Sequence, residues 1–168
     1  RLSLVGSEMC IRDRPNPIGW DETVDVRIDY IANPREGTYF FGPDDTYPNQ
    51  PWQAWTQGET EDNHHWVPLY DYPNERATFE TILTVDQRFQ AVSNGELLSV
   101  EKNKDGTHTW HWKENFPMVA YLISFVVGEF EKVEDSYKNI PVNYWVYKEN
   151  KHETERLSLI HISEPTRL

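Results

Sequence analysis

Short stretches in which apolar and polar residues alternate recur along the chain and predict β-strands. The segment 23–31, TVDVRIDYI, alternates valine, isoleucine and tyrosine with aspartate and arginine. This period of two is expected of a strand that is buried on one face only. A second stretch, FETILTV, places Phe79, Thr81, Leu83 and Val85 on one face in the same way. Both segments therefore predict strands that lie on a core.

Turn signals separate further strand segments. The stretch FQAV (89–92) runs into SNGE (93–96), in which an Asn-Gly pair readily supplies the positive φ angles of a tight turn. Farther on, LLSVEK (97–102) and THTWHW (107–112) flank NKDG (103–106). Two strand-like runs around such a turn predict a β-hairpin.

The last part of the chain predicts a buried strand and one more partly buried strand. The stretch VAYLISFVVGEF (119–130) is apolar on both faces, which is typical of a central strand, and VNYWVY (142–147) completes the series. We find no segment with a persuasive helical period, no internal repeat and no low-complexity linker. The pattern therefore predicts an all-β fold, either an antiparallel β-sandwich or a saddle-shaped double sheet.

The two ends of the chain have a foreign character. A nucleotide string that encodes Leu4–Asp13 also encodes Ser158–Thr166 when its reverse complement is read with a shift of one base. A library adapter joined to both ends of a DNA fragment produces this relation automatically, whereas folding gives no reason for it. We therefore expect residues 1–14 and 157–168 to be adapter-derived and non-native, and residues 15–156 to form one β domain.

Charge and cysteine content narrow the possible functions. The chain has 16 basic and 28 acidic residues and a net charge of −12. Such a chain is repelled by phosphate backbones and anionic lipids, so we expect neither nucleic-acid binding nor a membrane-surface role. The longest apolar run, 119–127, is much shorter than the roughly 20 residues of a spanning helix. The only cysteine, Cys10, lies in an adapter-derived end, so we expect no disulfide framework and no thiol nucleophile.

The histidines do not have the spacing of a metal site. His64 and His65 are adjacent, so in an extended segment their side chains would point to opposite faces and could not easily share one ion. We interpret them as loop or edge residues. His108 and His111 lie on opposite faces of a predicted strand, and we interpret them as surface or packing residues.

Other residue types suggest little chemistry. The serines have no G-x-S-x-G motif or paired base that would support a nucleophile. The seven tryptophans are consistent with a sugar-stacking platform, but aromatic residues are ordinary in strands and cores, and we favour the core. Asp71 is expected to cap or brace the turn that Pro73 begins.

Gln57 and Glu59 form a more specific pattern. Residues two apart in a strand share a face, so the amide and the carboxylate would be presented together beside Gly58, where a ligand can approach the backbone. Acceptor groups of this kind suit a protonated amine. From the residues alone, a solvated polar edge is the alternative.

These residues belong to a longer stretch that resembles a known family. The sequence TQGETEDNHHWVPLYDYPNERATFE (56–80) is similar to the T-Q-x-E/Q…P…D-x-P…K/R-A-T-F signature in the N-terminal domain of the M1 zinc aminopeptidases, the aminopeptidase N and leukotriene A4 hydrolase group. The resemblance continues through AVSNGELLSV, TWHWKENFPMVAYLISFVVGEFE and VNYWVY. It differs at Leu69, where many members have cysteine, and at His64, where arginine is common.

The resemblance implies a division of labour within a longer enzyme. In this family a separate catalytic domain carries zinc on an HExxH motif with a downstream glutamate, together with a GxMEN segment that holds the substrate's free amine. Neither motif occurs in this chain, so the resemblance implies a fragment that is inactive alone and has no metal site of its own. Its partners would be its own catalytic domain and peptide substrates with a free N-terminus.

Gln57 and Glu59 match the positions through which this N-terminal domain contributes one wall of the active site. The resemblance therefore implies that they bind substrate and that no catalytic residue lies in this chain. A stand-alone β-sandwich binding module, for carbohydrate or protein, remains the alternative function.

Overall fold

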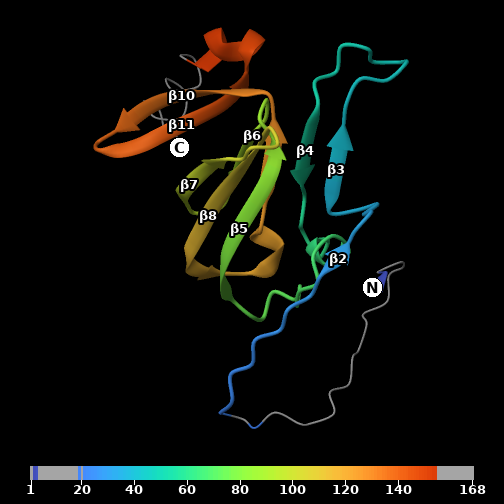
Figure 1. Cartoon of the computed structure of the whole chain (residues 1–168). Coiled ribbons are helices and arrows are strands. Elements are labelled where there is room, and N and C mark those ends of the chain that lie inside the picture. Colours follow the sequence, from blue (N-terminus) through green and yellow to red (C-terminus); the bar gives the residue numbers. More distant parts are fainter. Residues whose placement is uncertain (1, 4–18, 20, 155–168) are drawn as a thin grey trace, which may run out of the picture.

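The computed structural model describes residues 2–3, 19 and 21–154, and these residues form strands with three short 3-10 turns (Figure 1). The strands are β1 (Leu2–Ser3), β2 (Tyr30–Ile31), β3 (Thr38–Phe41), β4 (Gln53–Thr56), β5 (Ala77–Asp86), β6 (Gln90–Ser93), β7 (Glu96–Lys102), β8 (Thr107–Met118), β9 (Phe125–Gly128), β10 (Phe130–Tyr137) and β11 (Ile140–Tyr147). The 3-10 turns are η1 (Asn63–His65), η2 (Ala120–Leu122) and η3 (Lys148–Glu153). No helix in the described part of the chain is long and apolar enough to cross a membrane.

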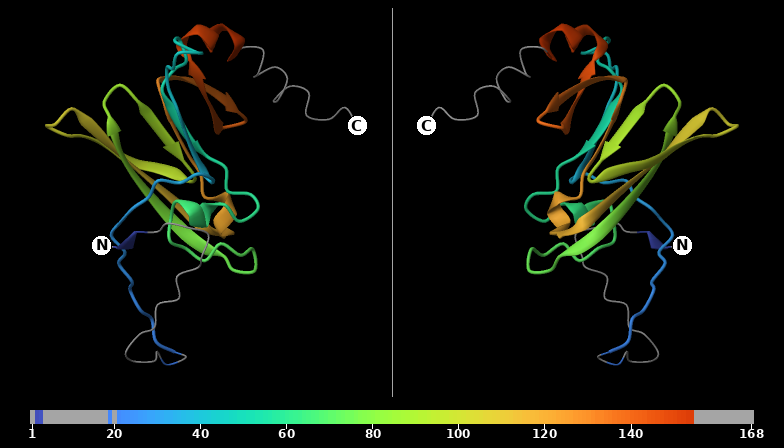
Figure 2. Two further views of the ribbon diagram at one scale, coloured as in Figure 1. Left: turned by 90° about the vertical axis from the view of Figure 1, so that its right-hand side faces the viewer. Right: turned by 90° about the vertical axis from the view of Figure 1, so that its left-hand side faces the viewer.

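Two antiparallel sheets form the body of the domain. One has the order β3-β4-β9-β6 and the other the order β5-β8-β7, and Figure 2 shows them as two layers that face each other. A separate antiparallel hairpin of β10 and β11 extends from one end of the layers (Figure 1). The all-β, antiparallel architecture predicted from the sequence is confirmed.

The core lies between the two sheets. Ala91 of β6 and Val127 of β9 pack against Trp110 and Trp112 of β8, and all four side chains are buried. Trp112 also donates its indole N–H to the carbonyl of Ala91, at 3.0 Å. This hydrogen bond gives the polar atom of a buried aromatic a partner and links the two sheets directly.

The patterns of the middle segment are confirmed in detail. Along β5 the burial alternates, with Phe79, Thr81, Leu83 and Val85 turned inward and the residues between them exposed. The predicted hairpin of β7 and β8 is present, and Asn103 donates its backbone N–H to the carbonyl of Thr107 at 2.9 Å. Alternation of apolar and polar residues thus predicted strands whose pairing partner lies nearby in the sequence.

The strand predicted over 23–31 is mostly wrong. Only Tyr30–Ile31 forms a strand, and it pairs in parallel with Leu2–Ser3. Residues 21–29 have no regular structure, and Val26 is 71% exposed. An alternating segment needs a neighbouring strand for its backbone groups and a core for its apolar face, and the described residues supply neither here.

The continuous central strand predicted over 119–130 is also wrong in part. Its first half folds into η2, in which Leu122 N–H bonds to Val119 O and Ile123 N–H bonds to Ala120 O. The second half forms β9, which does lie inside its sheet between β4 and β6. The apolar pattern predicted burial only in part, since Val119, Ala120, Ile123 and Val127 are buried but Leu122 and Val126 are exposed, and it did not distinguish a strand from a turn.

The expected boundaries of the domain are only partly covered by the described residues. Of the ends expected to be adapter-derived, the structure describes Leu2–Ser3, and the segment 157–168 lies outside the described residues. The strands β3, β4 and β10 were not predicted. In the sequence the first two flank a loop that contains three prolines, and their four-residue lengths give little periodicity.

Candidate functional site

The loop 57–62 joins β4 to η1 and contains the residues singled out as a possible amine site. The strand β4 ends at Thr56, so Gln57 and Glu59 do not lie on a strand as the sequence analysis assumed. The loop is instead held by two backbone hydrogen bonds: Gln57 N–H donates to Gly37 O at 3.0 Å, and Asp62 N–H donates to Gly58 O at 2.9 Å. These bonds replace sheet pairing as the source of local order.

Gln57 and Glu59 are both exposed, on either side of the buried Gly58. Within the described part of the chain, the structure gives neither side chain a hydrogen bond or ion pair, so both are available to a ligand. The peptide bond after Glu59 is cis. The Gln57 amide and the Glu59 carboxylate therefore extend into solvent on either side of Gly58, which is packed against the domain.

Two close backbone approaches hold this loop in place. A Cβ atom on Gly37 would overlap the carbonyl group of Asp62, and Gly37 also has a φ of +78°. A Cβ atom on Gly58 would overlap the carbonyl oxygen of Tyr121 and would lie 2.6 Å from the side-chain amide of Asn63. The turn before β3 and the η2 turn therefore contact the loop from separate parts of the sequence.

Asn63 is the most thoroughly bonded residue of this region, and the sequence analysis did not identify it. Its side chain is fully buried, with Nδ2 donating to Ala120 O at 2.7 Å and to Ile123 O at 3.0 Å. Its Oδ1 accepts the indole N–H of Trp66 at 2.9 Å. The partners of Nδ2 are about sixty residues away in sequence, so no local pattern marks the residue.

Asp71 has a different role from the one expected. It is buried, and its carboxylate accepts the backbone N–H of His64 at 2.9 Å rather than bracing the turn at Pro73. The ring nitrogen Nδ1 of His64 lies 3.4 Å from the same carboxylate oxygen. Asp71 therefore stabilises η1 because its segment passes beside that turn.

The two adjacent histidines lie in η1 and not in an extended segment. Their rings pack against each other with centroids 4.1 Å apart, so the expectation of opposite faces is wrong. Nε2 of His65 lies 3.2 Å from a carboxylate oxygen of Glu36 and 4.0 Å from one of Asp62. In the described part of the chain these three residues form the one group that could hold a metal ion. Polar contacts of His65 with two carboxylates at the partly exposed surface account for the same geometry.

The remaining candidates have structural roles. Trp110 and Trp112 belong to the core, which agrees with the favoured interpretation of the tryptophans. His111 lies on the outer side of β8, where its Nε2 is 3.0 Å from a carboxylate oxygen of Glu80. Lys113 contacts the other oxygen at 2.8 Å, and hydrogen bonds from Lys113 and then His111 hold the pKa of Glu80 below its usual value.

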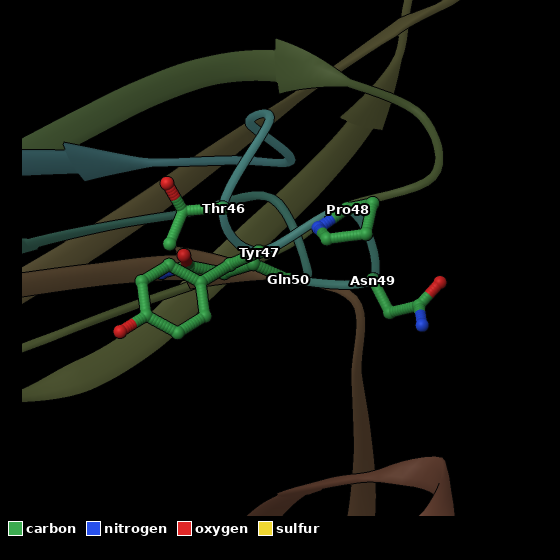
Figure 3. Close-up of a pocket in the computed structure, with 5 residues that line it drawn as sticks. All are labelled: Thr46, Tyr47, Pro48, Asn49 and Gln50. Carbon is green, nitrogen blue, oxygen red and sulfur yellow. The ribbon is translucent and has the colours of Figure 1, made fainter.

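A shallow hollow in the β3–β4 loop offers no comparable arrangement. Five consecutive residues line it: Thr46, Tyr47, Pro48, Asn49 and Gln50. Figure 3 shows the side chains of Thr46 and Tyr47 pointing to one side and that of Asn49 to the other. Since the polar groups diverge, the loop 57–62 is the better candidate for ligand binding.

Comparison with known proteins assigns a family to this fold and loop. The family model described as the peptidase M1 N-terminal domain matches residues 8–122, which include the loop 57–62. Glutamyl aminopeptidase of Bos taurus is 31% identical over 106 residues, covering 61% of this chain and 11% of that protein. Aminopeptidase N of Lactobacillus helveticus is 32% identical over 102 residues, covering 61% of this chain and 12% of that protein.

A solved structure supports the fold independently of these sequences. The crystal structure of Legionella pneumophila aminopeptidase A in complex with aspartic acid superposes with a TM-score of 0.55 at 24% identity, over 60% of this chain and 13% of that one. The matched part of the chain thus covers 11–13% of the length of these three proteins.

Proposed function

Because the chain belongs to the peptidase M1 N-terminal domain family, we propose that it forms one wall of the substrate site in a zinc aminopeptidase. In this role Gln57 and Glu59 help to bind the free N-terminus of a peptide. One observation carries the proposal: both side chains are exposed beside the buried Gly58, in a loop that is fixed at Gly37, Asn63 and Tyr121.

The chemistry of the two side chains suits a terminal ammonium group. The carboxylate of Glu59 can form an ion pair with this cation, and the uncharged amide oxygen of Gln57 can accept a further hydrogen bond from it. Holding the amine at a fixed point places the first peptide bond at the reacting centre, which restricts cleavage to N-terminal residues. The role is therefore one of positioning and involves no proton transfer by this chain.

Zinc and the catalytic residues belong, in this proposal, to a separate domain of a longer protein. When bound there, zinc polarises the scissile carbonyl and activates water. The group of Glu36, Asp62 and His65 differs from the family's zinc site, because it offers one histidine and two carboxylates where that site uses the two histidines of HExxH and a glutamate. The purified chain is accordingly expected to show no aminopeptidase turnover.

Kinetics of the full-length enzyme test the role of the pair. Glu59→Ala removes a charge-assisted contact worth roughly 1.5–3 kcal/mol, so we expect kcat/KM to fall about ten-fold to a hundred-fold for peptides with a free amine. Gln57→Ala should cost less, since an uncharged amide attracts the cation less strongly than a carboxylate does. The loss should largely vanish for N-acetylated substrates, which offer no cation.

Glu101→Ala serves as the matched control, because Glu101 is an exposed glutamate on β7, in the other sheet. An unchanged kcat/KM for Glu59→Ala, or an equal loss for Glu101→Ala, would show that Glu59 is an ordinary surface residue with no role in binding the amine. The alternative of a stand-alone sugar-binding module has less support, because the family match is to an aminopeptidase domain. Trp110 and Trp112 are buried in the core, whereas Trp52 is 50% exposed.

A further inference from the structure

The side-chain amide of Asn63 links η1, Trp66 and the η2 region by hydrogen bonds, next to the backbone of the proposed amine site. Both N–H groups of Nδ2 are used, on Ala120 O and Ile123 O, and Oδ1 accepts from Trp66. The side chain is completely buried. A fully satisfied buried amide of this kind specifies one arrangement of the segments around it, because any other leaves polar groups without partners.

The backbone of the proposed site rests directly on this amide. The Cα of Gly58 packs so closely that an added Cβ would lie 2.6 Å from both Oδ1 and Nδ2 of Asn63. The carbonyl of Gly58 also accepts the N–H of Asp62, the residue before Asn63. The position of Gly58, and with it the direction in which the two flanking side chains leave the backbone, therefore depends on Asn63.

We infer that Asn63 is a positioning residue for the substrate amine and acts through Gln57 and Glu59. The inference rests on the proposed function of that pair. Neither alanine nor aspartate reproduces the arrangement: alanine removes the donors to the Ala120 and Ile123 carbonyls and the acceptor of the Trp66 indole N–H, and aspartate brings a carboxylate against two carbonyl oxygens. Asn63 itself is buried and does not touch substrate.

The test compares Asn63→Ala with Asn103→Ala in the full-length enzyme. Asn103 is a matched control because its amide donates two side-chain hydrogen bonds, each of 2.9 Å, to Thr107 and Thr109 in the β7–β8 hairpin. Displacing the site loop should raise KM for free-amine peptides and lower kcat/KM roughly ten-fold, while N-acetylated substrates and the Asn103→Ala enzyme change little. In a Gln57→Ala, Glu59→Ala background the effect of Asn63→Ala should largely disappear, because it acts through the two residues already removed.

Trp66→Phe provides a milder variant if Asn63→Ala folds poorly. It removes only the donor to Oδ1 and keeps an aromatic ring beside Phe125, which Trp66 contacts edge-on at a centroid distance of 5.3 Å. We expect the same rise in KM, of smaller size. Hydrogen exchange in the 168-residue chain gives a readout without activity: the amides of Gln57 and Asp62 should exchange faster in Asn63→Ala and in Trp66→Phe than in Asn103→Ala.

The outcomes separate the two proposals. If Glu59→Ala lowers kcat/KM while Asn63→Ala and Trp66→Phe behave like Asn103→Ala, the role of Asn63 is refuted and the amine site stands. Equal losses from Asn63→Ala with and without Gln57 and Glu59 also refute it, since they show an action that bypasses the pair. If Glu59→Ala itself has no effect, the proposed function fails, and the inference fails with it.

Discussion

The carboxylate of the buried Asp71 accepts the backbone N–H of His64 across seven residues of chain, at 2.9 Å. This contact joins the segment that precedes Pro73 to the η1 turn. The turn contains Asn63, so the same hydrogen bond helps to seat the loop 57–62 on the domain. Asp71 was expected to brace the turn at Pro73, and it instead stabilises the η1 turn.

Replacing Asp71 should destabilise the domain. Asp71→Ala leaves the His64 N–H without its acceptor, and we expect the free energy of unfolding to fall by about 1–3 kcal/mol. Asp71→Asn keeps an acceptor oxygen and should cost less. Urea unfolding of the two variants measures this, with Asp45→Ala in the exposed β3–β4 loop as the control. Equal losses at Asp71 and Asp45 would contradict the structural role.

Two glycines with positive φ should respond differently to the same substitution. Gly106 has a φ of +84° and open space around it, whereas a Cβ on Gly37 meets the carbonyl of Asp62. Gly106→Ala should cost about 1–2 kcal/mol from backbone strain alone. Gly37→Ala should cost about 1–3 kcal/mol more, because the backbone of the site loop must also move.

Thermal and urea unfolding of both variants give the comparison. Similar losses for the two would show that the approach of Gly37 to Asp62 is not needed for stability. A loss confined to Gly37→Ala would show instead that the β7–β8 turn accepts a side chain freely.

The ion pairs of Glu80 predict a dependence on pH. Its pKa is lowered in the folded chain by Lys113 and His111, so its stabilising effect is present above the unfolded pKa of about 4.3 and is lost as the pH falls through the folded value. Glu80→Gln should therefore reduce stability near neutral pH and have little effect in acid. The effect should be small, because the side chain is about half exposed.

Urea unfolding of the wild type and Glu80→Gln, from neutral pH to below the folded pKa of Glu80, checks the direction in which their stability difference changes. Glu96→Gln, at an exposed glutamate at the start of β7, is the control. A difference between wild type and Glu80→Gln that grows as the pH falls would contradict the assignment.

Removing both expected adapter-derived ends should leave the domain intact. We expect a chain of residues 15–156 to unfold at the same free energy as the whole chain, within about 1 kcal/mol, or to be more stable. Trimming also removes the two-residue pairing of β1 with β2. A larger loss in urea unfolding would show that the ends belong to the fold.

Local sequence predicted the parts of the fold whose partners are close in the chain. The alternation in β5 predicted which of its residues face the core, and the turn at 103–106 predicted the β7–β8 hairpin, and both are confirmed. The segment 23–31 has an equally clear period but lacks a neighbour over most of its length among the described residues. An alternating pattern indicates which side chains a strand would bury, but it does not show that a neighbouring strand is present to pair with it.

The sequence identified two residues of the candidate site, but it did not predict the backbone conformation that carries them. Gln57 and Glu59 could be singled out from their spacing around Gly58, but the shared face expected of strand residues does not apply to them, because β4 ends at Thr56. Asn63 gave no signal, because the backbone carbonyls it binds belong to η2, more than fifty residues away. A buried amide is recognisable only once the long-range packing is known.

The distance in sequence between Asn63 and η2 also sets an order of events during protein synthesis. A chain emerging from the ribosome exposes residues 57–63 well before residues 120–123, and until those arrive the Asn63 amide has neither of its carbonyl partners. The loop therefore takes its final form only after most of this domain has been translated. A stop or a slow stretch of codons between the two segments would leave it exposed to proteases and chaperones in the growing chain.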